Sequence, residues 1–143
     1  MDKINILTAQ GEGPVDVAEA VRSTAFAAFL YDVPPGEASA PYHYEYEEEW
    51  LLVVEGEITV RTPEGEHALE RGDLLRFPAG PDGAHNVMNR SDAPARALLF
   101  SRTGQGVGVA VYPDSDTVGV WGGEKDLLFK RDSAVPLSER FRG

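Results

Sequence analysis

The sequence predicts an all-β domain, a sandwich or barrel built from about nine short strands. Fifteen glycines and ten prolines are spread along the 143 residues, where they separate short apolar runs instead of gathering in a linker. Turn residues spaced in this way are typical of sandwiches and barrels and not of alternating α/β folds. The length suits one domain, so we expect a single domain over residues 1–143.

The apolar runs predict the strands in order. Residues 25–33 form one run that ends at a Pro-Pro-Gly turn, and residues 50–54 are apolar on both faces, as expected of a strand inside a barrel. Residues 57–62 alternate with a period of two and return through a Pro-Glu-Gly turn, which predicts a hairpin. Only residues 15–22 have a helical pattern. The remaining expected strands cover residues 66–69, 74–77, 84–89, 95–101, 107–112 and 118–121.

The composition excludes several classes of protein. Twenty-four acidic residues against thirteen basic ones give a net charge of −11, which repels nucleic-acid backbones and anionic membrane surfaces. The absence of cysteine excludes disulfides, thiolate zinc sites and cysteine nucleophiles. The apolar runs are far shorter than a membrane span, and because no apolar core of useful length follows Met1, we expect no signal peptide. We therefore expect a cytoplasmic protein with no nucleic-acid or membrane partner.

The acidic stretch before the strand at 50–54 contains the first candidate metal ligands. His43 and Glu45 are two residues apart, so they share one face of an extended segment and together can grip a divalent metal. An isolated acidic run is usually a solvated face, but Glu49 directly precedes an apolar strand. A carboxylate drawn into such a core is costly unless a cation or hydrogen bonds compensate its charge. Metal coordination would provide that compensation.

His85 is a further candidate. A single histidine near a loop is more often an ordinary surface or core residue with a satisfied hydrogen bond, so His85 means little without its context. The third histidine, His67, falls in the expected hairpin, and we predict that it is exposed and has no role in the site.

Two motifs supply that context for His85. The first motif, whose first gap is one residue longer than usual, comprises Gly36, His43, Glu45, Glu49 and Gly56. The second, with four residues instead of two before its histidine, comprises Gly72, Pro78, Gly80, His85 and Asn89. Together they resemble the cupin family, which implies a double-stranded β-helix (jelly-roll) barrel. The motif core spans residues 36–89, flanked by residues 1–24 and 122–143, and the later part of the chain is similar to small prokaryotic cupins of unassigned activity.

The resemblance also implies one divalent metal ion in the barrel, held by His43, Glu45, Glu49 and His85. Glu45 stands where cupins typically have a second histidine. Two imidazoles and two carboxylates cancel the charge of a divalent ion, which favours Mn²⁺ or Fe²⁺ without excluding Zn²⁺ or Ni²⁺. Two alternatives stay open. Glu45 turns away and leaves a triad of two histidines and one carboxylate, or the substitution has degraded the site and no metal binds.

Two functions of different class follow from this interpretation. The first is a metal-dependent enzyme, an oxygenase or an isomerase-like activity, that acts on a small polar molecule, with Glu45 as fourth ligand or as base. The second is a non-catalytic barrel that binds a small ligand, with a relaxed or metal-free site. Small cupins of this type commonly pair through edge strands, so the resemblance also implies a homodimer.

Overall fold

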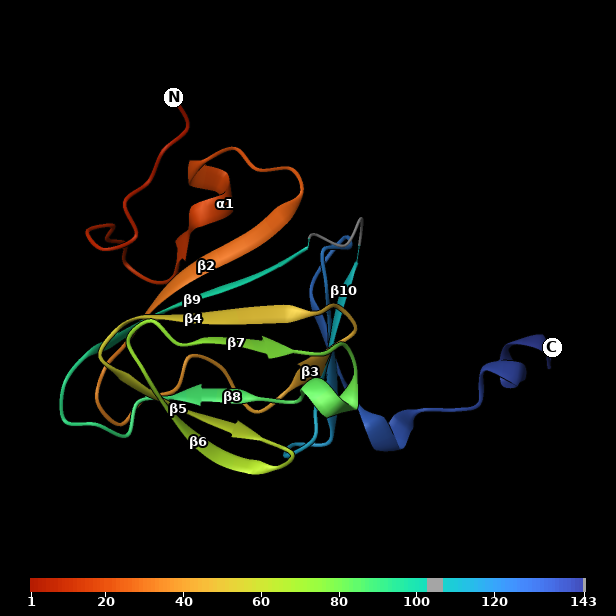
Figure 1. The fold of residues 1–143 in the computed structure, drawn as a ribbon. Helices are drawn as coiled ribbons and strands as arrows, with labels where there is room; N and C mark the ends of the chain where they lie inside the picture. Colours follow the sequence, from red (N-terminus) through yellow and green to blue (C-terminus); the bar gives the residue numbers. More distant parts are fainter. Residues whose placement is uncertain (103–106, 143) are drawn as a thin grey trace.

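The computed structural model describes residues 1–102 and 107–142, and it confirms an all-β, double-stranded β-helix (jelly-roll) fold (Figure 1). The expected domain also includes residues 103–106 and 143, which lie outside the described residues. A five-stranded sheet has the order β1-β2-β9-β4-β7. Its strands are β1 (Val15–Asp16), β2 (Phe26–Val33), β9 (Ala95–Arg102), β4 (Glu49–Glu55) and β7 (Leu74–Phe77).

Two smaller sheets complete the barrel, with orders β12-β11-β10-β3 and β6-β5-β8. The first contains β12 (Leu127–Lys130), β11 (Thr117–Trp121), β10 (Gly108–Tyr112) and β3 (Tyr44–Glu45). The second contains β6 (Gly65–Glu70), β5 (Glu57–Thr62) and β8 (Asn86–Met88). The helices are short, namely α1 (Val17–Ala20), η1 (Pro81–Gly83), η2 (Arg131–Ser133) and η3 (Leu137–Phe141). None in the described parts of the chain is long and apolar enough to cross a membrane.

The predicted elements are confirmed with local corrections. The expected hairpin is β5 and β6, whose register brings Thr62 opposite Gly65. The helix predicted over residues 15–22 is wrong in extent, because β1 takes its first two residues and α1 ends after four. Continuation is blocked at Arg22, whose φ of 55° is left-handed. The sequence missed β1 and β3, which have two residues each, and β12, which lies in the segment expected to flank the barrel.

The apolar core fills the end of the barrel between the five-stranded and three-stranded sheets. Inward-facing residues alternate along the strands, as expected when one face of each sheet is buried. Gly56 joins β4 to β5 with a φ of 74°, and a Cβ there would lie 2.7 Å from the Pro94 carbonyl oxygen, so this turn requires glycine. The core comprises Val33, Leu51, Val53, Ile58, Val60, Phe77, Val87, Ala95, Ala97 and Leu99.

The inward faces of the same strands continue into a cavity at the other end of the barrel. Along β4, Val53 and Leu51 are buried in the core, whereas Glu49, the next inward residue, lines the cavity. Along β9, buried Ala97 is followed on the same face by Leu99 and then by Ser101, which also lines the cavity. The strand register that places apolar side chains in the core therefore also places polar side chains in the cavity.

Candidate functional site

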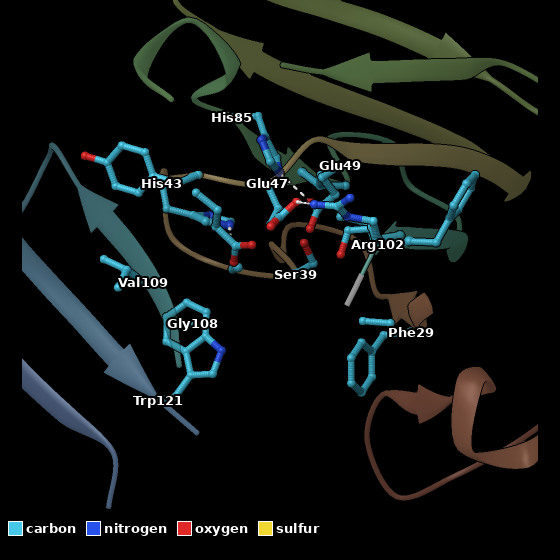
Figure 2. Close-up of a pocket in the computed structure, with 18 of the residues that line it drawn as sticks. Phe29, Ser39, His43, Glu47, Glu49, His85, Arg102, Gly108, Val109 and Trp121 are labelled. Carbon is cyan, nitrogen blue, oxygen red and sulfur yellow. Dashed lines mark hydrogen bonds and ion pairs between the residues drawn. The ribbon is translucent and has the colours of Figure 1, made fainter. Parts of the chain in front are cut away.

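A cavity of about 550 Å³ lies between the inner faces of the five-stranded and four-stranded sheets (Figure 2). It brings together all four residues that the sequence singled out, namely His43, Glu45, Glu49 and His85. They come from β3, from β4 and from the segments just before β3 and β8. Other polar residues that line the cavity include Tyr31, Ser39, Glu47, Ser101, Arg102 and Tyr112.

A short backbone contact places the two histidines side by side. The His43 N–H donates to the His85 carbonyl at 3.0 Å, and the His85 N–H donates to the His43 carbonyl at 2.8 Å. This reciprocal pair is an isolated antiparallel bridge, and the two imidazole centroids lie 4.8 Å apart. Directly opposed residues of an antiparallel pair project to the same side, so both rings enter the cavity.

Both imidazoles are oriented by their own backbone. Nδ1 of His43 lies 2.8 Å from the Pro41 carbonyl oxygen, and Nδ1 of His85 lies 2.8 Å from the Gly83 carbonyl oxygen. A carbonyl oxygen only accepts hydrogen bonds, so Nδ1 carries a proton in each ring and the neutral ring keeps its lone pair on Nε2. Nε2 is therefore the atom that each ring can offer to a metal ion.

His85 is held tightly against Glu49. Its Nε2 lies 2.9 Å from Oε1 of Glu49, and the ring, whose side chain is 3% exposed, stacks on Phe77 with centroids 3.6 Å apart. The pairing of β4 with β7 sets Phe77 opposite Glu49, which brings both groups to the histidine. Because Nδ1 already holds one proton, a contact of this length requires a second proton between Nε2 and Oε1, or a cation that both atoms face.

His43 and Glu45 lie farther apart. Nε2 of His43 is 4.0 Å from Oε1 of Glu45, which is too long for a hydrogen bond. Burial lowers the pKa of His43 and the neighbouring His85 lowers it further, although the Pro41 carbonyl and the charge of Glu49 oppose this shift. The His43 ring is therefore neutral at pH 7, and this pair is not an ion pair.

The cavity disfavours further negative charge. Burial raises the pKa of Glu45 to about 7, and the charge of Glu49 adds to this effect. Burial also raises the pKa of Tyr31 and of Tyr112, with a further contribution from the nearby glutamates. The two phenols therefore remain hydrogen-bond donors, and a cation among the carboxylates would relieve their mutual repulsion.

The donor set fits a divalent cation in its chemistry. Two imidazole Nε2 atoms and two carboxylates are ligands that Mn²⁺, Fe²⁺, Zn²⁺ and Ni²⁺ accept. Within residues 1–102 and 107–142, however, no three His, Asp or Glu side chains converge closely enough to hold a metal ion as they stand. The structure brings the four residues together as two neighbouring pairs, and metal binding by them stays a prediction.

Sequence reasoning did not identify several residues of the cavity. Alternate residues of a strand share a face, so Ala27, Phe29 and Tyr31 lie on one face of β2. By the same rule Glu47 lies on the same side as Glu49. The alternation does not tell which of the two faces is inward. The approach of the Arg102 guanidinium to Glu47, at 3.8 Å between Nη2 and Oε2, had no signal in the sequence.

Two polar residues named by the sequence lie outside the cavity. His67 is exposed on β6, as predicted, with its Nε2 3.2 Å from Oγ1 of Thr62. Asn89, the last residue of the second motif, is 1% exposed and donates to the carbonyls of Val33 and Ala93 at 2.8 and 2.7 Å. Asn89 thus fixes the backbone at the end of β2.

Similar proteins of known structure share this architecture. A sugar phosphate isomerase of the cupin superfamily from Silicibacter pomeroyi is 27% identical, with a TM-score of 0.79 over 88% of this chain and 80% of that one. A structure from Acidithiobacillus ferrooxidans, proposed to be a sugar phosphate isomerase, is 22% identical, with a TM-score of 0.77 over 87% of this chain and 79% of that one. The second likeness is informative for the fold alone.

The sequence comparisons agree with the structural ones. The tetracenomycin polyketide synthase protein TcmJ of Streptomyces glaucescens is 30% identical over 68 residues, which are 48% of this chain. The chain spans only 44% of that relative's length. The sequence model of the cupin domain matches residues 29–101, just over half of the chain, and this range contains both motifs and all four cavity residues that they supply. The chain belongs to the cupin family.

Proposed function

We propose that this cupin binds one divalent cation through His43, Glu49 and His85, with Glu45 beside them as a fourth donor or as the base, and that the centre acts on a small uncharged polar molecule. The observation that carries the proposal is the orientation of the imidazoles. Each ring donates Nδ1–H to a backbone carbonyl, which leaves Nε2 for the cavity, where the carboxylates lie. Two neutral imidazoles and two carboxylates favour Mn²⁺ or Fe²⁺, while Zn²⁺ and Ni²⁺ remain compatible.

The reaction class that the site supports best is an isomerisation by proton transfer. A bound cation would polarise a substrate carbonyl or hydroxyl oxygen. In a hydroxycarbonyl substrate, Glu45, which lines the same cavity, would take a proton from the hydroxyl-bearing carbon and return it to the carbonyl carbon, while the hydroxyl proton moves to the former carbonyl oxygen. Such a step balances without an oxidant, whereas an oxygenase needs dioxygen as a second substrate. The likeness to the Silicibacter pomeroyi isomerase supports the same class.

The charges of the cavity favour an uncharged substrate over a phosphate ester. Glu45, Glu47 and Glu49 all line the cavity, and Arg102 is the one lysine or arginine among the described lining residues. Its side chain is 78% exposed and already faces Glu47. With the proposed divalent cation bound, the charges of the cation, of Arg102 and of the three glutamates cancel, so the site offers a phosphate no excess positive charge. We expect a sugar to bind more tightly than its own phosphate ester in equilibrium dialysis.

The first experiment is elemental analysis of untagged protein purified without chelator. The proposal predicts near-stoichiometric Mn, Fe, Ni or Zn in the wild type and a large loss of metal in His85→Ala. The matched control is His67→Ala, which removes an imidazole outside the cavity and should leave the metal content unchanged. Absence of metal even after anaerobic reconstitution would overturn the proposal.

A specific observation favours a second candidate, a non-catalytic barrel that binds a small ligand without metal. His43 and Glu45 are 4.0 Å apart, and no three possible ligands converge among the described residues. Glu45→His distinguishes the candidates, because it restores the residue that cupins typically carry. A large gain in metal occupancy in this variant supports a degraded site, whereas unchanged occupancy supports a site that is already competent.

We also propose that two copies of the chain pair through β12. This strand is at the edge of its sheet, all four of its residues are exposed, and Leu127, Leu128 and Phe129 are apolar. An exposed apolar edge strand invites pairing with another chain. Sedimentation should show a dimer that Leu128→Lys disrupts and that Leu74→Lys, at an exposed apolar residue of β7, leaves intact. A monomeric wild type contradicts this proposal.

Location in the cytoplasm stays a prediction.

A further inference from the structure

The four-stranded sheet turns small residues and two aromatic ones toward the cavity. The register of β10 and β11 sets Gly108 opposite Trp121 and Ala110 opposite Gly119, and Tyr112 follows on the same face of β10. Glu45 of β3 is paired with Ala110 and lines the cavity, which identifies this face as the inward one. Trp121 and Tyr112 are therefore the large side chains on this inner surface of β10 and β11.

The two glycines allow the indole of Trp121 to lie flat on the sheet. A Cβ at Gly108 would be 2.3 Å from Nε1 and 2.6 Å from Cε2 of the indole. A Cβ at Gly119 would be 3.2 Å from Cε2 of Tyr112 and 3.5 Å from Cζ3 of Trp121. The φ of Gly108 is not left-handed, so its backbone would accept other residues. The position needs glycine for room, because the indole lies directly on the strand.

The indole packs against β10 at Gly108, and it also borders the cavity. Trp121 is only partly buried, and it lines the cavity together with the histidines and glutamates. Figure 2 shows Trp121 beside Gly108, across the cavity from Phe29, with Glu49 and His85 above both in this view. The indole and the four polar residues therefore border one cavity, where a single small molecule can contact both.

We propose that Trp121 is a stacking surface for the ligand, and that the ligand is an uncharged ring with an apolar face and neighbouring hydroxyl or carbonyl oxygens on one edge. The apolar face would pack on the indole, which gains both buried area and the attraction of the aromatic face for C–H groups. The oxygens would meet the cluster of His43, Glu45, Glu49 and His85. This inference rests on the proposed function, because the oxygens of the ligand would be bound by the proposed metal centre.

The test uses a Trp50→Phe background, in which Trp121 is the only tryptophan. Trp50 stacks on Phe100 with centroids 6.3 Å apart and does not line the cavity. The probes are D-xylose, catechol and xylitol, the last being the open-chain counterpart of xylose. We expect the ring probes to change Trp121 fluorescence and xylitol to leave it unchanged. The stronger response of the two ring probes distinguishes a sugar ring from an aromatic ring.

Variants of the sheet test whether the flat indole matters. Gly108→Ala should weaken binding of the responding ring probe about tenfold, because the new methyl displaces the indole. Gly13→Ala is the matched control, since a Cβ there meets nothing within 4 Å. Isothermal titration calorimetry, which needs no tryptophan, should show that Trp121→Leu loses the same affinity and that Trp121→Phe keeps most of it. Unchanged affinity in Gly108→Ala and Trp121→Leu overturns the inference, as does a wild-type indole that neither ring probe affects at millimolar concentration.

Metal analysis of the same samples separates this inference from the proposed function. Stoichiometric metal without a fluorescence response to either ring probe refutes the stacking surface and leaves the metal centre standing. A fluorescence response in protein that binds no metal supports the stacking surface and refutes the metal centre.

Discussion

The two ends of the barrel are built from the same strands with opposite chemistry. At the closed end, the inward residues of β4 are Val53 and Leu51, which are 1% and 0% exposed. At the open end, the next inward residue is Glu49, which contacts a buried histidine. The strand does not change its pairing there, because Glu49 is in register with both β7 and β9. The difference teaches that backbone pairing fixes where a side chain points, while only side-chain chemistry separates the core from the site.

The largest effect is expected from a substitution in the apolar core at the closed end of the barrel. Leu51→Ala should lower the free energy of unfolding by about 3 kcal/mol, because the side chain is fully buried and the core cannot collapse onto the space. Glu49→Gln, two residues away, should change it by less than about 1 kcal/mol, since the amide can donate to Nε2 of His85. Urea denaturation measures both. The same Glu49→Gln variant should lose its metal, and equal destabilisation by the two changes would contradict the contrast.

The next largest effect is the pH dependence of stability that Glu45 causes at the open end of the barrel. With the pKa of Glu45 raised to about 7, the folded state binds more protons than the unfolded state between about pH 4 and pH 7. This contribution to stability is complete at low pH and is lost as the pH rises through about 7.

Glu45→Gln removes that titration. In chelator-treated protein, the free energy of unfolding of the variant relative to wild type should rise by about 1–2 kcal/mol between about pH 5 and pH 8. The effect is no larger because the Glu45 side chain is 27% exposed, so solvent screens part of its charge. Urea denaturation at the two pH values provides the measurement. A difference that does not change with pH would show that Glu45 ionises as freely in the folded state as in the unfolded one.

A smaller effect is expected where the two ends meet, at Phe77. This residue is 3% exposed in the core and stacks on His85. Phe77→Leu should cost about 1 kcal/mol of stability, as for other conservative core changes, and should weaken metal binding about tenfold by freeing the imidazole. The control is Phe26→Leu, at a residue that is 54% exposed on β2 and does not line the cavity. Competition with a chelator measures the affinity, and equal affinities in the two variants would remove Phe77 as a positioning residue.

The smallest effect is expected outside both ends. His67→Ala should change the free energy of unfolding by less than about 0.5 kcal/mol, because His67 is exposed and its Nε2 contacts a threonine hydroxyl on the neighbouring strand. Thermal and urea unfolding should both match the wild type. A clear loss of stability would mean that the β5–β6 hairpin depends on this contact.

The sequence predicted the barrel well because its signals are local. Period-two alternation and turn residues located most strands, and the motif spacing brought His43, Glu45, Glu49 and His85 to one cavity. Elements of two residues, such as β3, were missed because so short a segment has no period. Tyr31 and Trp121 were not assigned to the site because their positions depend on which face of a strand is inward, and tertiary pairing decides that. The position of the indole depends on Gly108, which only the register of β10 and β11 places opposite it.

The reciprocal amide bonds between His43 and His85 make the two loops that carry them one opening unit. Lifting either segment breaks both bonds, and the neighbouring bonds from Ser39 to Val87 and from Gly80 to Glu45 tie the same loops again. The amide hydrogens of His43 and His85 should therefore exchange with solvent at the same rate, as members of one cooperative fluctuation. Any opening large enough to admit a molecule past these loops would also separate the histidines, so entry and release along this side are coupled to dismantling the site.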